Sequence, residues 1–177
     1  MTTSRRNRLH PALLLACVLA GSLCIGSPAW STETTTPEPT ALAKLQDLTQ
    51  RASELAIYAL SMLGIRYKYG GTTPENGLDC SGLVGYVFKE TWGAILPRTA
   101  EEISRVGQHI ETKDLQPGDL VFYNTLRRGF SHVGIYLGDN KFIHSPSTGG
   151  EVRIESMDIN YWKKRFNGAR RINDPEQ

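Results

Sequence analysis

The hydrophobic pattern of this 177-residue chain changes period once, at Pro117-Gly118, and this change limits the possible folds more than any other feature. Before it, apolar residues recur three and four positions apart, which is the spacing of one helical face. After it, short apolar or alternating runs are separated by Gly, Pro, Asn and Asp, which is typical of an antiparallel meander. Helices followed by strands indicate an α+β fold.

The first part of the chain is expected to contain three helices. Apolar faces predict one helix over residues 45–63 and a second over residues 80–92, each ended by a glycine. Residues 67–78 between them contain Gly and Pro and are predicted to form a loop. Thr99 and Glu102 have the spacing of a capping box, which predicts a short third helix.

The second part is expected to bring two histidines together. The predicted strands are residues 120–123, 132–137, 141–145 and 152–154. If residues 138–140 form a three-residue hairpin loop, His132 and His144 lie diagonally on one face, about 7 to 8 Å apart between Cα atoms. Gly134 shares that face and is expected to leave room for the helix that begins at Cys80. A slip of one residue would send the two rings to opposite faces.

The N-terminus has the organisation of a secretory signal peptide. Three arginines precede an apolar run over residues 12–25, and small residues follow it. We expect residues 1–29 to be removed after Ala29, residues 30–41 to form a disordered linker, and residues 42–177 to form one catalytic domain. The apolar run is too short to cross a bilayer stably, so we expect an exported protein with no transmembrane segment.

Two other export routes have weaker support. The residues before Cys17 and Cys24 resemble a lipoprotein box, but each segment carries a leucine where that box requires a small residue. Arg5 and Arg6 resemble a twin-arginine signal, but Arg8 stands where such a signal prefers an apolar residue. The chain has 20 Lys and Arg against 18 Asp and Glu, and the signal holds three of the arginines, so the exported part is nearly neutral. We therefore expect no nucleic-acid partner.

Cys80 is the single cysteine after residue 29. In an oxidising compartment a structural cysteine is usually paired, so an unpaired one indicates a reactive thiol. Its position at the start of a predicted helix favours the thiolate, because the helix dipole is positive there, and predicts a thiol pKa below that of a free cysteine. An inert buried cysteine is the structural alternative.

The residue types supply the parts of nucleophilic catalysis on a carbonyl. Cys80 is the candidate nucleophile, His132 the general base, and His144 the third polar group that orients His132. The backbone N–H of Cys80 and the Tyr67 hydroxyl are candidate donors to an oxyanion. This chemistry requires no metal and no cofactor. Zinc binding by the cysteine and both histidines is an alternative, although zinc sites usually have a fourth ligand and tighter spacing.

Five segments carry a resemblance to a known family: Tyr67–Gly71, Asp79–Val84, Leu96–Thr99, Pro117–Phe122 and Ser131–Gly138. In this order they resemble the NlpC-type cell-wall cysteine peptidases, over roughly residues 56–172. Residues 161–171 are similar to the end of the Spr-type murein endopeptidases in that family. The resemblance implies a papain-like core and the catalytic residues Cys80, His132, His144 and Tyr67. It also implies a substrate in the peptide stems or cross-links of peptidoglycan, cut at bonds that involve D-amino acids.

Three residues near the cysteine are candidates for substrate binding. Asp79 and Ser81 flank Cys80, and each is equally well interpreted as a helix cap. Arg98 could bind a substrate carboxylate, but a structural ion pair or hydrogen bond to a neighbouring loop is the favoured interpretation.

The leading hypothesis is an exported, monomeric peptidoglycan endopeptidase in the periplasm or cell wall, which acts through a thioester acyl-enzyme. Its regulatory partner, if it has one, is not identified by the sequence. An amidase or acyltransferase with the same residues is an alternative within this chemistry. An inactive wall-binding module is the alternative of another class, and retention of Cys80, His132 and His144 together argues against it.

Overall fold

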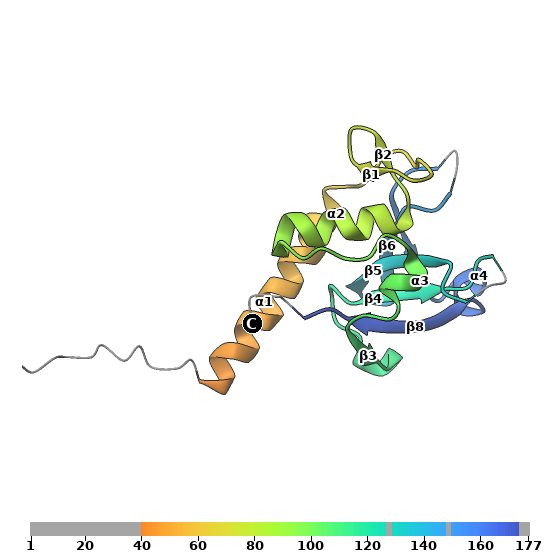
Figure 1. The fold of residues 1–177 in the computed structure, drawn as a ribbon. Coiled ribbons are helices and arrows are strands. Elements are labelled where there is room, and N and C mark those ends of the chain that lie inside the picture. Colours follow the sequence, from red (N-terminus) through yellow and green to blue (C-terminus); the bar gives the residue numbers. More distant parts are fainter. Residues whose placement is uncertain (1–39, 127–128, 148–149, 174–177) are drawn as a thin grey trace, which may run out of the picture. The chain divides into compact units, whose positions relative to one another are not determined.

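The chain after residue 107 contributes all the strands of a six-stranded antiparallel sheet in the computed structural model, which describes residues 40–126, 129–147 and 150–173. In spatial order its strands are β3 (Gln108–Ile110), β8 (Phe166–Arg171), β4 (Leu120–Tyr123), β5 (His132–Gly138), β6 (Lys141–His144) and β7 (Arg153–Ser156). The four predicted strands form the expected meander. The sequence pattern missed β3 and β8, and β8 lies between β3 and β4 (Figure 1).

The remaining elements precede or connect these strands. They are α1 (Ala41–Leu60), β1 (Thr72–Thr73), β2 (Gly77–Leu78), α2 (Cys80–Trp92), α3 (Ala100–Ile103), the 3-10 turn η1 (Thr112–Asp114) and α4 (Asn160–Lys163). The fold is therefore α+β, as predicted. The expected signal peptide, residues 1–29, and residues 30–39 of the expected linker lie outside the described residues. No helix in residues 40–126, 129–147 and 150–173 is both long enough and apolar enough to cross a bilayer.

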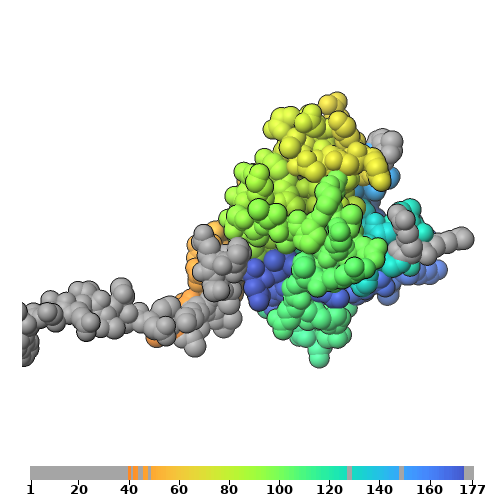
Figure 2. Space-filling model, in the orientation of Figure 1, coloured from red at the N-terminus to blue at the C-terminus, as the bar shows by residue number. Residues whose placement is uncertain are grey.

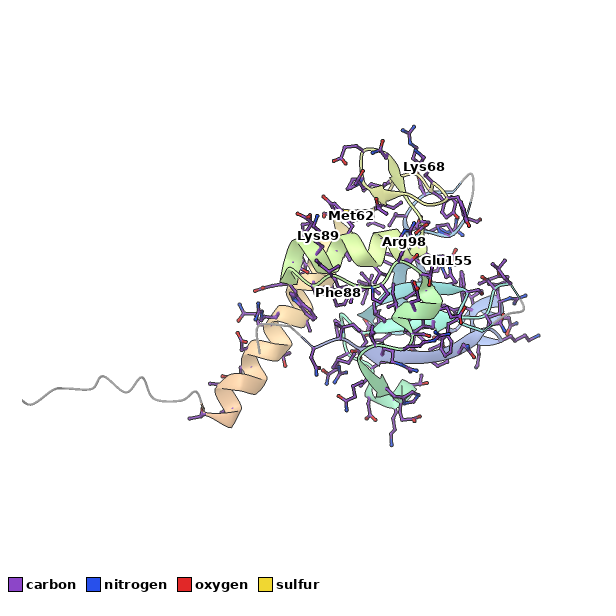
Figure 3. All side chains as sticks on the ribbon, viewed as in Figure 1. Met62, Lys68, Phe88, Lys89, Arg98 and Glu155 are labelled. Carbon is purple, nitrogen blue, oxygen red and sulfur yellow. The ribbon has the colours of Figure 1, made fainter. Side chains whose placement is uncertain are left out.

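Helices α1 and α2 cover one face of the sheet (Figure 1). Apolar residues of both helices are buried in one core with residues of β4, β5 and β6, and Figure 3 shows Phe88 of α2 on the side of the helix that faces the strands. The core members with no exposed surface include Leu55, Ala59, Leu83, Val84, Val87, Phe88, Val133, Ile135 and Ile143. At about 25 cal/mol per Å² of apolar surface removed from water, this burial is the main force that attaches the helices to the sheet.

The opposite face of the sheet is also buried. Its core contains Ile110, Val121, Tyr123, Tyr136, Phe142, Met157, Trp162 and Ala169. Successive strand residues point to opposite faces, so Leu120 and Phe122 contact the helix-side core while Val121 and Tyr123 contact this second core. All four residues of β4 are therefore buried.

The turn between β5 and β6 differs from the predicted loop but keeps the predicted register. Asp139 and Asn140 both have positive φ, 49° and 54°, and form a two-residue turn. An irregularity between Tyr136 and Gly138 absorbs the extra residue. The prediction of a three-residue loop is wrong in this detail. Because Ile135 still pairs with Ile143, His132 and His144 occupy one face, as expected.

That face is not the one that α2 covers. His132 alternates with Val133, which packs against α2, and the His132 ring instead stacks on Trp162 in the second core. The predicted role of Gly134 is therefore wrong, because a Cβ there would lie 2.7 Å from Phe142 Cδ2 and 3.2 Å from His144 Cβ, both in β6. Gly134 leaves room for the neighbouring strand and not for the cysteine helix.

The first turn of α2 packs closely against the backbone of the preceding loop. A Cβ on Gly82 would lie 2.0 Å from the carbonyl oxygen of Gly71. The same oxygen accepts a hydrogen bond from the Asp79 N–H at 3.2 Å, so it is held in place. In Figure 2 this yellow-green segment, from β1 through α2, lies above the green segment that contains α3 and β3. The contact between the loop and the helix therefore fixes the position of Cys80, the first residue of α2.

Candidate active site

A groove of about 830 Å³ is lined by Cys80, His132 and Tyr67 together. Cys80 is the first residue of α2 and His132 is the first residue of β5, so the groove lies where the helix layer meets the start of that strand. Arg98 and Glu155 also line it, and both are labelled in Figure 3 near the end of α2. The structure thus brings three of the predicted catalytic residues to one surface from three separate segments.

The thiol of Cys80 is partly buried and contacts backbone groups. Burial is the main cause that raises the pKa of Cys80, and the nearby Asp79 carboxylate raises it further. Backbone hydrogen bonds from Val133, Ser81 and Cys80 itself act in the opposite direction. The helix start is present as predicted, with Asp79 as its N-cap. The predicted lowering of the thiol pKa is wrong, because the loss of hydration on burial outweighs the backbone hydrogen bonds that favour the thiolate.

The pH dependence of alkylation tests this reversal. Because the pKa of Cys80 is raised, the rate of reaction with iodoacetamide should rise with pH along a curve centred above the free-thiol value of about 8.5. Rates measured by intact mass between pH 5 and pH 10, beside a small-molecule thiol under the same conditions, give the two midpoints. A Cys80 midpoint below that of the reference thiol would contradict the dominance of burial.

His132 and His144 form a direct hydrogen bond between Nε2 of His132 and Nδ1 of His144, 2.9 Å apart. The pKa of each ring is lowered to about 3, mainly by burial, and the neighbouring His144 contributes to the lowering for His132. Both imidazoles are therefore neutral near pH 7. With Nε2 of His132 engaged by His144, Nδ1 of His132 is the atom left to accept a proton.

Tyr67 lies beside the cysteine on the loop before β1. Its backbone N–H donates to the Gly150 carbonyl at 2.7 Å, which fixes the loop. Burial is the first cause that raises the pKa of Tyr67, followed by the proximity of Cys80 and Asp79. The phenol is therefore protonated near pH 7 and can donate a hydrogen bond into the groove.

Asp79, Ser81 and Arg98 form one cluster in the groove wall. Arg98 Nη1 and Nη2 donate to the two carboxylate oxygens of Asp79 at 3.1 and 2.5 Å, and Nη1 also donates to Ser81 Oγ at 2.8 Å. Asp79 Oδ1 accepts from the Gly82 N–H at 2.7 Å, which caps α2, and Oδ2 accepts from the Gly70 N–H at 2.9 Å. The structure thus brings the three residues together, and they position the start of the cysteine helix.

Sequence reasoning missed Glu155, Arg153 and Trp162. Glu155 Oε2 lies 3.5 Å from His144 Nε2 and accepts a hydrogen bond from Trp162 Nε1, and Glu155 Oε1 accepts one from Arg153 Nε at 2.7 Å. The last predicted strand stopped at residue 154, whereas β7 continues to Ser156. If the predicted strand had been extended by two residues, Glu155 would have been placed beside the strand that carries His144.

Within the described parts of the chain, no three His, Cys, Asp or Glu side chains are grouped so that they could hold a metal ion. The polar atoms of the histidines instead face each other and a carboxylate.

Comparison with known proteins identifies relatives over most of this domain. A family model described as the NlpC/P60 family matches residues 64–171. Murein DD-endopeptidase MepH of Escherichia coli (strain K12) is 44% identical over 131 residues, which are 72% of this chain and 48% of the relative. Murein DD-endopeptidase MepS/Murein LD-carboxypeptidase of the same strain is 44% identical over 109 residues, 62% of this chain and 56% of the relative.

A third relative is the Gamma-DL-glutamyl hydrolase of Bacillus subtilis (strain 168), 42% identical over 113 residues, 63% of this chain and 27% of the relative. The matched part of this chain thus spans between 27% and 56% of the length of these relatives.

Solved structures support the fold. An NlpC/P60 family protein from Bacillus cereus ATCC 10987 superposes with a TM-score of 0.63 at 34% identity, covering 68% of this chain and 39% of that chain. The NlpC/p60 domain of the peptidoglycan hydrolase SagA superposes with a TM-score of 0.60 at 28% identity, covering 68% of this chain and 98% of that domain. The predicted papain-like arrangement, with helices packed on an antiparallel sheet, is confirmed.

Proposed function

Because this chain belongs to the NlpC/P60 family, we propose that it is a cysteine peptidase that hydrolyses peptide bonds in the stems or cross-links of peptidoglycan. Two relatives are murein endopeptidases, which supports this substrate. The observation that carries the proposal is that Cys80 and His132 line one open groove, with His132 hydrogen-bonded to the buried His144 behind it. A binding module has no need of such a convergence.

The proposed reaction begins from a neutral thiol and a neutral imidazole. Cys80 Sγ attacks the carbonyl carbon of the scissile bond while Nδ1 of His132 takes the thiol proton. The proton transfer accompanies the attack because the raised pKa of the thiol and the lowered pKa of the imidazole disfavour a thiolate–imidazolium pair before the substrate reacts. His144 holds the other ring nitrogen of His132 and orients the base.

The developing oxyanion accepts hydrogen bonds from the backbone N–H of Cys80 and from the Tyr67 hydroxyl. His132 then gives its proton to the leaving amine, and the C–N bond breaks to leave a thioester on Cys80. Water, deprotonated by His132, attacks the thioester and regenerates the thiol with release of the new carboxylate. Asp79, Ser81 and Arg98 in the groove wall contact the bound stem peptide in this proposal.

The proposed setting is outside the cytoplasm. Residues 1–29 act as a signal peptide cleaved after Ala29, residues 30–41 form the linker, and the catalytic domain of residues 42–177 is released as a monomer into the periplasm or cell wall. The composition of residues 1–29 supports export, and the substrate requires it.

Digestion of purified sacculi tests the function. The chain without residues 1–29 should release stem or cross-link peptides that mass spectrometry identifies, and Cys80→Ala should release none. The masses of the fragments identify the bond, which matters because the relatives' names specify different ones. Acyl groups transferred to an acceptor other than water would instead support an acyltransferase. Sacculi that bind both proteins but stay intact would support a wall-binding module.

A further inference from the structure

We propose that Glu155 is a positioning residue for the histidine pair: its carboxylate holds the His144 proton on Nε2, so that Nδ1 of His144 stays free to accept from His132. The effect on turnover rests on the proposed function. The position of the proton on His144 is a property of the folded protein and can be measured without a substrate.

The positions of the protons follow one from another. If His132 is to accept the thiol proton on Nδ1, its own proton must be on Nε2. That N–H then donates to His144 Nδ1, 2.9 Å away, so the proton of the neutral His144 must be on Nε2. If His144 were protonated on Nδ1, two N–H groups would face each other, unless His132 moved its own proton to Nδ1. In that second case Nδ1 of His132 could no longer accept the thiol proton. The competence of the base therefore depends on what faces His144 Nε2.

Glu155 faces that atom. His144 has no exposed surface, and its Nε2 has no hydrogen-bond acceptor among the described residues. A buried N–H without an acceptor is costly, so the site favours any acceptor that can approach it. Glu155 Oε2 lies 3.5 Å from Nε2, a little beyond hydrogen-bond distance, and a small movement of either side chain closes the gap. A carboxylate accepts hydrogen bonds only, so it selects the N–H tautomer at Nε2.

Two further side chains hold the Glu155 carboxylate in this position. Trp162 Nε1 donates to Oε2, and Arg153 Nε donates to Oε1 at 2.7 Å. The Trp162 ring also stacks on His132, with ring centres 5.4 Å apart and planes at 24°, and meets His144 edge-on at 5.0 Å. One tryptophan thus packs against both imidazoles and fixes the carboxylate behind them.

The charge of Glu155 also favours the protonated base that forms during the reaction. The carboxylate acts to raise the pKa of His132, against the burial that lowers it. Burial is the main cause that lowers the pKa of His144, and the charge of Arg153 lowers it as well, so His144 stays neutral. The carboxylate therefore stabilises the imidazolium at His132 through an uncharged His144, as the aspartate of a serine-protease triad does for its histidine.

The test combines nuclear magnetic resonance with kinetics. Long-range ¹H–¹⁵N spectra of the wild-type protein at pH 7 should show His144 protonated on Nε2 and not on Nδ1.

Glu155→Gln keeps the size of the side chain and one acceptor oxygen but removes the charge. We expect its kcat to fall about 10- to 100-fold, the loss typical when the outer hydrogen-bond partner of a metal-bound imidazole is replaced. KM and the melting temperature should stay close to the wild-type values.

Glu90→Gln is the matched control, because Glu90 is exposed near the far end of α2 from Cys80. It should leave kcat unchanged. A wild-type His144 protonated on Nδ1, or a kcat for Glu155→Gln equal to that of Glu90→Gln, would overturn the proposal. If the wild-type protein cleaves no peptidoglycan, the proposed function fails, while the spectra of the wild-type protein and of Glu155→Gln still show whether the His144 tautomer depends on Glu155.

Discussion

Replacing His132 by glutamine should lower kcat on peptidoglycan by about three orders of magnitude, the contribution typical of a positioned general base. Glutamine has no basic nitrogen, so the Cys80 proton has no acceptor when the carbonyl is attacked. With the thiol pKa raised by burial, few molecules carry a thiolate at pH 7, and the variant cannot rely on one. The measurement is kcat from released peptides at saturating substrate.

His109→Gln supplies the control for this variant. His109 lies in β3, its side chain is 59% exposed, and the strand is at the far edge of the sheet from β7. The same chemical change there should leave kcat at the wild-type value. Circular dichroism should show that both variants are folded. Retention of more than a tenth of the activity by a folded His132→Gln protein would remove His132 from the role of base.

Replacing Gly82 by alanine should destabilise the fold by about 3 kcal/mol, toward the upper end of the cost of overpacking. The added Cβ would lie 2.0 Å from the Gly71 carbonyl oxygen and 3.1 Å from Asp79 Oδ1. The carbonyl belongs to the backbone and accepts from the Asp79 N–H, so it cannot rotate away without losing that bond. Either the loop or the first turn of α2 must move, and both carry site residues. Urea denaturation followed by tryptophan fluorescence measures the loss.

Gly85→Ala is the internal reference for Gly82→Ala. Gly85 is on the same helix, and a Cβ there meets nothing within 4 Å. Because glycine inside a helix costs roughly 0.5 to 1 kcal/mol relative to alanine, this change should raise the free energy of unfolding. The two substitutions, both in α2, should therefore change the free energy of unfolding in opposite directions. Equal midpoints of urea denaturation for Gly82→Ala and the wild type would show that the loop can move away from the added Cβ at no cost in stability.

The sequence predicted those features that local patterns determine. Residues 80–92 form α2 as predicted, with Asp79 and Gly93 at its ends, because the apolar spacing and the capping residues agree. The capping box of Thr99 and Glu102 is present. His132 and His144 were correctly placed on one face, because strand alternation has a period of two and the total number of residues in the hairpin fixes the register.

Features that depend on distant contacts were missed. A bulge with a two-residue turn and a simple three-residue loop give the same register, so the pattern around Asp139 could not distinguish them. The insertion of β8 between β3 and β4 joins segments far apart in the chain. The thiol pKa was predicted from the helix start alone, whereas the burial that reverses it depends on packing around Cys80. Glu155 reaches His144 only through the pairing of β7 with β6.

The proposed nucleophile and its proposed proton acceptor belong to different layers of the molecule. Cys80 begins a helix on one face of the sheet, and His132 begins a strand whose ring packs toward the other. No single helix or strand carries both groups, so they meet only when the helix layer packs against the sheet. The proposed reaction therefore requires that the helix layer has first docked onto the sheet, and a chain that has not completed this docking is expected to cleave no peptide bond.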